Sequence, residues 1–242
     1  MSGTETAGGR EQLASRAPSA GAAVRTDLPI EGVREQIKRH LGAARRLVIT
    51  APTGSGKSTR VPRFLLEDGL AAGRILVLEP RRLAARVLAE RVANELGEAP
   101  GITVGYRTRF ENCGTETTRI WYITEGILPR LLQDGEGLNG IGAVVFDEFH
   151  ERSITGDVCL GVLRRVQSRR PHLAVVVMSA TLDAAAVCGY LGGCPHVHTE
   201  GRLFPVELSY LPKPATPAFW EDAAAAVASC VQIGRASCRE RV

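Results

Sequence analysis

The chain has 242 residues, enough for one large α/β domain with a sizeable core, and its 44% hydrophobic content is ordinary for a soluble globular protein. The formal net charge is only +4, so no overall basic field marks a nucleic-acid-binding protein. The first residues lack the apolar core of a signal peptide, and no apolar run approaches the ~20 residues that span a bilayer. These features favour a cytoplasmic protein.

The six cysteines contain no CxxC pair, which favours reduced thiols over a disulfide framework. Cys188, Cys194, His196 and His198 invite a zinc interpretation. Their spacing matches no usual zinc-ligand pattern, however, and Cys188 falls in a predicted helix. The interpretation without zinc is therefore favoured.

In chain order, residues 1–26 are small and polar without periodicity, which predicts a disordered tail. Apolar residues then recur at helical spacing from Ile30 to Leu41. Beyond them, short apolar runs alternate with helical segments. Nearly unbroken Val/Ile/Leu runs fit parallel strands buried on both faces, so the pattern predicts a doubly wound, mostly parallel α/β sheet with helices on both faces. The predicted strands are Leu47–Thr50, Ile75–Leu78, Thr103–Tyr106, Ile120–Ile123, Ala143–Phe146 and Ala174–Met178.

A glycine-rich stretch, APTGSGKST, follows the first predicted strand and opens a helix. Such a turn exposes backbone N–H groups to phosphate oxygens, and the helix N-terminus adds its positive dipole. Lys57 can reach the β- and γ-phosphates, and Ser58 can offer its hydroxyl to Mg²⁺. Ala51 stands where the GxxxxGK[ST] pattern has its first glycine. The position between strand and helix favours a phosphate-binding loop over a surface turn with a chance lysine.

Two adjacent carboxylates, Asp147 and Glu148, follow the apolar run IGAVVF. An aspartate at the tip of a buried strand can hold Mg²⁺, and the glutamate can act as general base toward water. Neighbouring strand residues point to opposite faces, so a local turn is needed to bring both to one site. Since ligands of such sheets bind at the carboxyl ends of strands, we expect this pair to lie near Lys57.

With these residues in view, the chain resembles the DEAH-box branch of superfamily 2 helicases, and most closely bacterial RNA helicases of the HrpB type. The resemblance covers about residues 28–231. It rests on DEFHERS at 147–153, EPRRLAAR at 79–86, VGYRTRFE at 104–111, TEGIL at 124–128 and SAT at 179–181.

The resemblance implies a RecA-like P-loop NTPase that uses ATP and Mg²⁺ and grips nucleic acid, with single-stranded RNA favoured, through its backbone. Asp147 would help hold Mg²⁺ with Ser58, and Glu148 would orient or deprotonate water. His150, Ser179 and Thr181 would link the nucleotide state to the grip on nucleic acid, and Arg81, Arg82 and Thr124 would contact the nucleic-acid backbone. The residues implied to bind ATP are Gly54, Ser55, Gly56, Lys57, Ser58 and Thr59.

The resemblance places the ATP-binding domain at residues 27–199. Residues 200–231 are expected to form a connector and the start of a truncated second RecA-like domain, with an extended segment at Phe204–Leu211 and a helix at Ala218–Val231. Residues 232–242 resemble a translated sequencing adapter, so we treat them as an artefact. A chain without the second domain should bind ATP weakly and fail to unwind duplexes, because phosphoryl transfer depends on positioning and electrostatics from both domains.

Other interpretations stay open. Without the second domain, the chain could be a non-enzymatic module that binds nucleic acid or a partner. A P-loop small-molecule kinase is a third possibility, disfavoured by the arginine-rich segment and the SAT element. Arg81 and Arg82 could be an ordinary solvated helix face, and Ser179 and Thr181 could end a strand and cap the helix that begins near Leu182.

Overall fold

The structure is a computed structural model that describes residues 28–133, 138–181, 183–201 and 219–239. The chain divides into two units, Met1–Arg202 and Leu203–Val242, which are considered separately. The predicted tail at 1–26 and the predicted extended segment Phe204–Leu211 lie outside the described residues.

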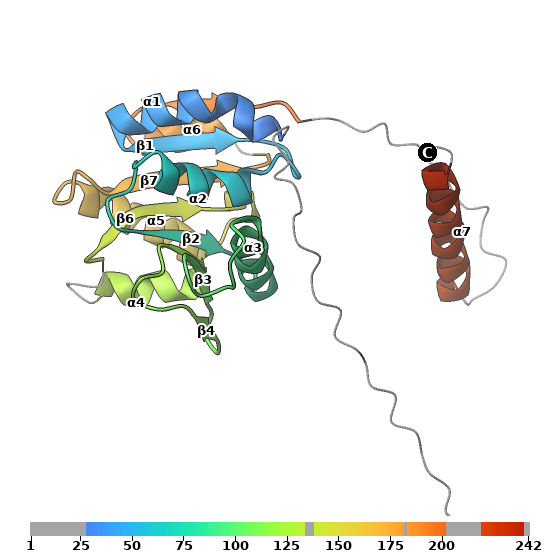
Figure 1. Ribbon diagram of the computed structural model, residues 1–242. Coiled ribbons are helices and arrows are strands. Elements are labelled where there is room, and N and C mark those ends of the chain that lie inside the picture. The colour runs from blue at the N-terminus through green and yellow to red at the C-terminus, as the bar shows by residue number, and fades with distance from the viewer. Residues whose placement is uncertain (1–27, 134–137, 182, 202–218, 240–242) are drawn as a thin grey trace, which may run out of the picture. The chain divides into compact units, whose positions relative to one another are not determined.

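The first unit is built on an eight-stranded sheet with the order β4-β3-β5-β2-β6-β7-β1-β8 (Figure 1). All its strand pairs are parallel except β3 with β4. The strands are β1 Arg46–Thr50, β2 Arg74–Glu79, β3 Val104–Arg107, β4 Asn112–Cys113, β5 Ile120–Thr124, β6 Ile141–Phe146, β7 Ala174–Ser179 and β8 His196–His198.

This architecture confirms the predicted doubly wound, mostly parallel sheet, and each of the six predicted strands is present. The sequence reasoning missed β4 and β8, because runs of two and three residues carry no readable periodicity. β8 brings His196 and His198 to the hydroxyl of Thr50, at 2.7 and 2.9 Å. Among the described residues, no group of three or more His, Cys, Asp or Glu side chains could hold a metal ion.

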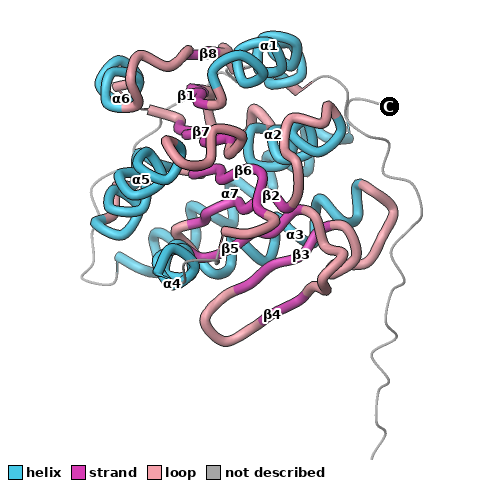
Figure 2. Tube along the Cα trace, turned by 90° about the vertical axis from the view of Figure 1, so that its left-hand side faces the viewer, coloured by secondary structure: helices cyan, strands magenta, loops and turns pink. Residues whose placement is uncertain are grey.

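Helices cover both faces of the sheet (Figure 2). One apolar core joins α1, α2 and α3 to the sheet, and a second joins α4, α5 and α6 to the opposite face. Central strands such as β7 are buried along their whole length, as expected for parallel strands between two helical layers. The helices are α1 Arg34–Ala44, α2 Lys57–Glu67, α3 Arg82–Glu95, α4 Leu128–Gln133, α5 Ile154–Gln167 and α6 Ala184–Tyr190, with short 3₁₀ helices η1 Pro29–Val33, η2 Glu125–Ile127 and η3 Phe149–Glu151.

A proline inside α2 is accommodated by a tyrosine from the sheet. Pro62 has no N–H, so it cannot donate to the carbonyl of Ser58 one turn earlier. The hydroxyl of Tyr122, on β5, donates to that carbonyl at 2.7 Å. The bond satisfies the carbonyl and ties the first turn of α2, which follows the glycine-rich loop, to an interior strand of the sheet.

The second unit contains helix α7, Phe219–Arg239, which agrees with the helix predicted from Ala218 to Val231. The helix continues over residues 233–239, and a helical conformation does not bear on where those residues originate. Their assignment to an adapter therefore stays a prediction. No helix within the described ranges is both long and apolar enough to cross a membrane.

Candidate active site

The glycine-rich loop between β1 and α2 turns through two glycines with positive φ, Gly54 at 80° and Gly56 at 92°. A Cβ atom on Gly56 would lie 2.8 Å from Cδ1 of Leu28, closer than packed carbon atoms approach. The carbonyl of Ser55 accepts a 3.2 Å hydrogen bond from the N–H of Ile30. The backbone conformation and the contact with the residues around η1 together hold the loop in place.

Gly56→Ala is expected to destabilise the chain by about 1–2 kcal/mol, because alanine must adopt the left-handed backbone and also meets Leu28. Gly42→Ala is the matched control: a Cβ added to Gly42, in α1, would find no described atom within 4 Å. That change should stabilise by about 0.5–1 kcal/mol. Urea unfolding measures both, and equal effects at the two positions would contradict this account of the loop.

Lys57 begins α2 and is nearly buried, with 3% of its side chain exposed. Its Nζ donates to Oε1 of Glu148 at 3.0 Å, although the two residues are 91 positions apart. The loop after β1 and the carboxylates after β6 therefore meet at the carboxyl end of the sheet. This is the juxtaposition that the sequence predicted.

A tight backbone turn places the two carboxylates side by side. Asp147 still belongs to the sheet, since its N–H donates to the carbonyl of Leu78 at 3.0 Å. Glu148 then adopts a left-handed conformation, with φ 47° and ψ 39°, and its N–H donates to Oδ1 of Asp147 at 2.8 Å. A non-glycine residue at positive φ is uncommon and is typical of functional turns. The turn is the one that the sequence analysis required.

Asp147 has an oxygen suited to a hard cation. Its side chain is 3% exposed, and Oδ2 is buried without a hydrogen-bond partner among the described residues. Burial raises the pKa of Asp147, while the neighbouring Ser58 hydroxyl and the charge of Lys57 oppose that rise. A buried, unpartnered carboxylate oxygen next to a hydroxyl fits Mg²⁺, which prefers oxygen ligands. The residues present therefore fit the ion that the sequence implied.

A third carboxylate, Glu79, belongs to the same cluster, and the sequence reasoning did not single it out as a site residue. It ends β2, next to β6, and is 1% exposed, with Oε1 lacking a partner in the described part of the chain. Burial, followed by the proximity of Asp147, raises the pKa of Glu79 to about 10. The available signal was a carboxylate ending an apolar run, which is also what marked Asp147.

We expect Glu79→Gln to make the free energy of unfolding less sensitive to rising pH. With an ordinary pKa of 4.5 and a folded-state pKa of about 10, the folded chain holds a proton on Glu79 that the unfolded chain has lost. The stability that this bound proton contributes is fully present below the pKa of Glu79 in the unfolded chain. It is lost as the pH rises toward the pKa of Glu79 in the folded chain. Without Mg²⁺, the free energy of unfolding by urea should fall more steeply between about pH 6 and pH 9 in the parent than in the variant. An equal pH dependence of the free energy of unfolding in the two proteins would contradict the raised pKa of Glu79.

His150 and Ser179 extend the cluster toward β7. Nδ1 of His150 lies 3.3 Å from Oε2 of Glu148 and 3.3 Å from Oγ of Ser179. Thr181 is exposed, and within the described residues no hydrogen bond joins it to these side chains. Helix α6 is capped by Asp183, whose side chain accepts from the N–H of Ala186, so the capping role suggested for Ser179 and Thr181 is wrong.

The predicted nucleic-acid contacts lie around the carboxyl ends of β2 and β5, which are adjacent because Glu79 pairs with Thr124. Arg81 is 73% exposed and pairs with Glu151 at 2.9 Å. The guanidinium of Arg82 lies 5.1 Å from the ring centre of Phe110, a side chain that is 69% exposed. An exposed aromatic ring beside arginines is typical of surfaces that stack bases.

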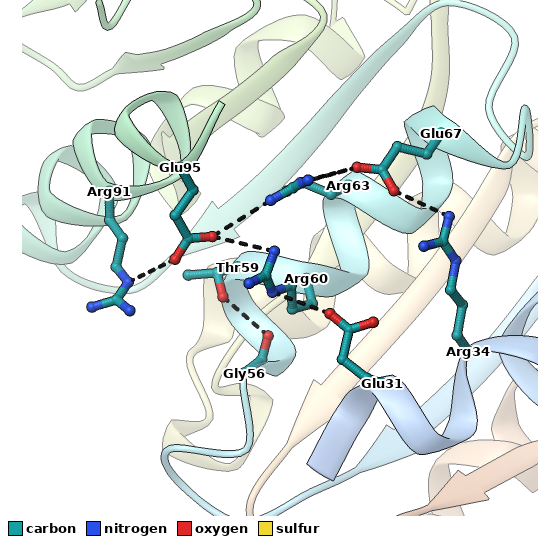
Figure 3. A network of polar contacts seen from close by, with 9 residues as sticks. All are labelled: Glu31, Arg34, Gly56, Thr59, Arg60, Arg63, Glu67, Arg91 and Glu95. Carbon is teal, nitrogen blue, oxygen red and sulfur yellow. Dashed lines mark hydrogen bonds and ion pairs between the residues drawn. The ribbon is translucent and has the colours of Figure 1, made fainter. Parts of the chain in front are cut away.

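A polar network anchors α2 beside this site (Figure 3). Arg60 is buried and pairs with Glu31 at 3.2 Å and with Glu95 at 3.4 Å. Arg63 also pairs with Glu95, at 3.6 Å. These contacts connect α2 to η1 and to the end of α3, the helix whose first turn carries Arg82. The loop and the arginines of α3 are thus attached to one connected group of elements.

The sheet order and the positions of the loop after β1 and the carboxylates after β6 are those of a RecA-like domain. A model of the DEAD/DEAH box helicase family matches residues 33–187, and the chain belongs to this family. It is 45% identical over 208 residues to the ATP-dependent RNA helicase HrpB of Escherichia coli strain K12, covering 86% of this chain and 26% of that protein. It is 40% identical over 192 residues to the putative ATP-dependent RNA helicase DHX57 of Homo sapiens, covering 77% of this chain and 14% of that protein.

Solved structures agree with these similarities. A crystal structure of the Escherichia coli DEAH/RHA helicase HrpB superimposes with a TM-score of 0.77 at 45% identity, covering 85% of this chain and 26% of that one. A crystal structure of the E. coli DExH-box NTPase HrpB gives a TM-score of 0.71 at 44% identity, covering 88% of this chain and 26% of that one. The chain therefore spans about 26% of the length of HrpB.

Proposed function

We propose that this domain binds ATP with Mg²⁺ and, joined to a second RecA-like domain, hydrolyses it in response to single-stranded RNA so that duplexes are unwound. The observation that carries the proposal is the 3.0 Å contact between Lys57 and Glu148 beside a buried oxygen of Asp147 that has no hydrogen-bond partner among the described residues. It brings a phosphate-binding cation, a metal-binding oxygen and a general base together within one small region.

Each side chain has a distinct role in this proposal. The N–H groups at Gly54–Thr59 surround the phosphates, and Lys57 donates to the terminal one. Ser58 and Asp147 would hold the magnesium ion, whose charge stabilises the negative charge that develops on the phosphates. Glu148 accepts a proton from the attacking water, and the left-handed turn points its carboxylate toward Lys57.

Coupling to nucleic acid would run through His150. Its ring lies between Glu148 and Ser179, so a shift of β7 or of the following segment would move the general base. Arg81, Arg82 and Thr124 would contact the phosphate backbone, which positions the strand without reading its sequence. The names of the relatives support RNA over DNA as the ligand, and free thiols at the described cysteines agree with a cytoplasmic location.

We further propose that residues 27–199 form the ATP-binding domain and that 200–231 form a connector and the start of the second domain. Two domains are expected to sandwich the triphosphate, and arginines of the second would contribute ~10³–10⁵ in rate. If the arginines of the second domain are indispensable for hydrolysis, this chain alone is a binding module without turnover, which is the second candidate function.

Phosphate release measured with and without single-stranded RNA tests the proposal in a protein that carries both domains. Stimulation by RNA is the expected result, and turnover at full rate without RNA would contradict it. Single-turnover hydrolysis by the present chain, compared with its ATP affinity, distinguishes a weak enzyme from a binding module. Robust unwinding by this chain alone would contradict the required second domain.

A further inference from the structure

A row of arginines follows the amino-terminal ends of the strands, at the end of the domain opposite the glycine-rich loop. Arg119 directly precedes β5, Arg74 begins β2, and Arg46 begins β1. Arg170 lies between α5 and β7. The strands run from left to right in Figure 1, so their amino-terminal ends lie at the left, and Figure 2 views the domain from that side.

Neutral acceptors hold the row in place. Arg119 donates to the carbonyl of Gly73 at 3.2 Å, and Arg74 donates to the carbonyl of Asn139 at 3.0 Å. The side-chain oxygen of the same Asn139 accepts from Arg170 at 2.6 Å. These bonds order the guanidinium groups across neighbouring strands without neutralising their charge.

Within the described ranges, the arginines at this end form no ion pair with a carboxylate, whereas Arg34, Arg86 and Arg152 each pair with an Asp or Glu. Glu116 is exposed and lines a cleft with Arg74 and Arg119, and no ion pair joins these three described residues. Asp134 and Glu136 belong to a stretch outside the described residues. Among the residues that the structure describes, no ion pair is made by Arg45, Arg46, Arg74, Arg119, Arg165, Arg169 or Arg170.

The shape of the surface suits an extended anion. The row crosses β5, β2, β6, β7 and β1, about 19 Å at a spacing of about 4.8 Å per strand, which is far longer than a single phosphate. Next to it, a cleft of about 500 Å³ is lined by Arg165, Arg169 and Arg170 together with apolar side chains such as Leu131 and Val162. Guanidinium groups bind phosphates through paired N–H donors, and apolar floors accept bases.

We propose that this arginine row, together with Arg165 and Arg169 of the adjoining cleft, is a second nucleic-acid surface, which binds the phosphate backbone of single-stranded RNA at the end of the domain away from the ATP site. The modest net charge of +4 does not indicate this surface, because a net charge does not show where the charged residues lie. The surface goes beyond the proposed ATP-dependent function and does not depend on it, since the row lies at the opposite ends of the strands from the glycine-rich loop and the carboxylates that follow β6.

The double variant Arg165→Glu/Arg169→Glu tests the proposal in the full 242-residue chain. Both side chains are exposed and make no hydrogen bond within the described residues, so the variant should fold. Fluorescence anisotropy with a labelled single-stranded RNA, in the absence of nucleotide, should show Kd raised on the order of tenfold. The slope of log affinity against log salt should fall by about 1.4, since each phosphate contact contributes about 0.7.

Lys38→Glu/Arg39→Glu is the matched control, because it makes the same charge change on the exposed side of α1. Its RNA affinity should stay close to that of the parent, and ATP binding should be unchanged in both double variants. The proposal is overturned if the parent does not bind RNA at low salt, if Arg165→Glu/Arg169→Glu binds as the parent does, or if the control loses as much affinity. A parent chain that binds RNA but does not bind ATP would count against the proposed function instead.

Discussion

Replacing Glu148 by glutamine is expected to lower RNA-stimulated ATP hydrolysis by roughly 10²–10⁴-fold, the usual contribution of a positioned general base. Glutamine keeps the shape and can still accept the hydrogen bond that Lys57 donates at 3.0 Å. It cannot take a proton from water. ATP binding should therefore persist while turnover fails. Phosphate release at saturating RNA measures the effect in a protein that carries both domains.

Glu35→Gln provides the matched control, because Glu35 is exposed in the first turn of α1, on an element that does not carry the site. Its turnover should equal that of the parent. If the Glu148→Gln protein hydrolysed ATP at more than about a tenth of the parental rate, Glu148 would not be the general base.

Lys57→Ala is expected to weaken ATP binding by the present chain roughly 10- to 100-fold, the equivalent of losing a charge-assisted hydrogen bond of about 1.5–3 kcal/mol. The ammonium group is nearly buried, so solvent screens its interaction with phosphate weakly. Its loss also leaves Glu148 without the cation that it contacts. Titration with a fluorescent ATP analogue in the presence of Mg²⁺ measures the change.

Lys38→Ala removes the same charge from an exposed position on α1 and should leave ATP affinity unchanged. Together, Lys57→Ala and Glu148→Gln separate binding from chemistry: the first should change affinity, and the second should change only turnover. If Lys57→Ala bound ATP as tightly as the parent, the loop would not be the phosphate site.

The fold was predictable largely because its strands are buried on both faces. Runs such as Ala174–Met178 are apolar throughout, and β7 is buried at every position from Ala174 to Ser179. Local sequence could not reveal β8, which is three residues long and pairs with β1 through contacts distant in the chain. The use of Tyr122 to satisfy the carbonyl freed by Pro62 also depends on a distant strand.

The candidate site was predictable to the extent that strand ends mark it. The loop after β1 and the carboxylates after β6 follow apolar runs, and parallel strands bring such ends to one edge. Glu79 joins them only because β2 and β6 are neighbours in the sheet, and no local pattern encodes that order. The sequence did not predict the arginine row for a similar reason, because its members are scattered along the chain. The sheet order brings them together, and the structure shows which described arginines lack a carboxylate partner.

A crystal structure of the chain with Mg²⁺ and a non-hydrolysable ATP analogue tests the central claim most directly. The account predicts that the terminal phosphate contacts Nζ of Lys57 and that the metal ion lies between Ser58 and Asp147, with Glu148 facing the phosphate. Nucleotide bound away from the Gly54–Thr59 loop, or a metal ion that does not contact Asp147 directly or through water, would contradict it.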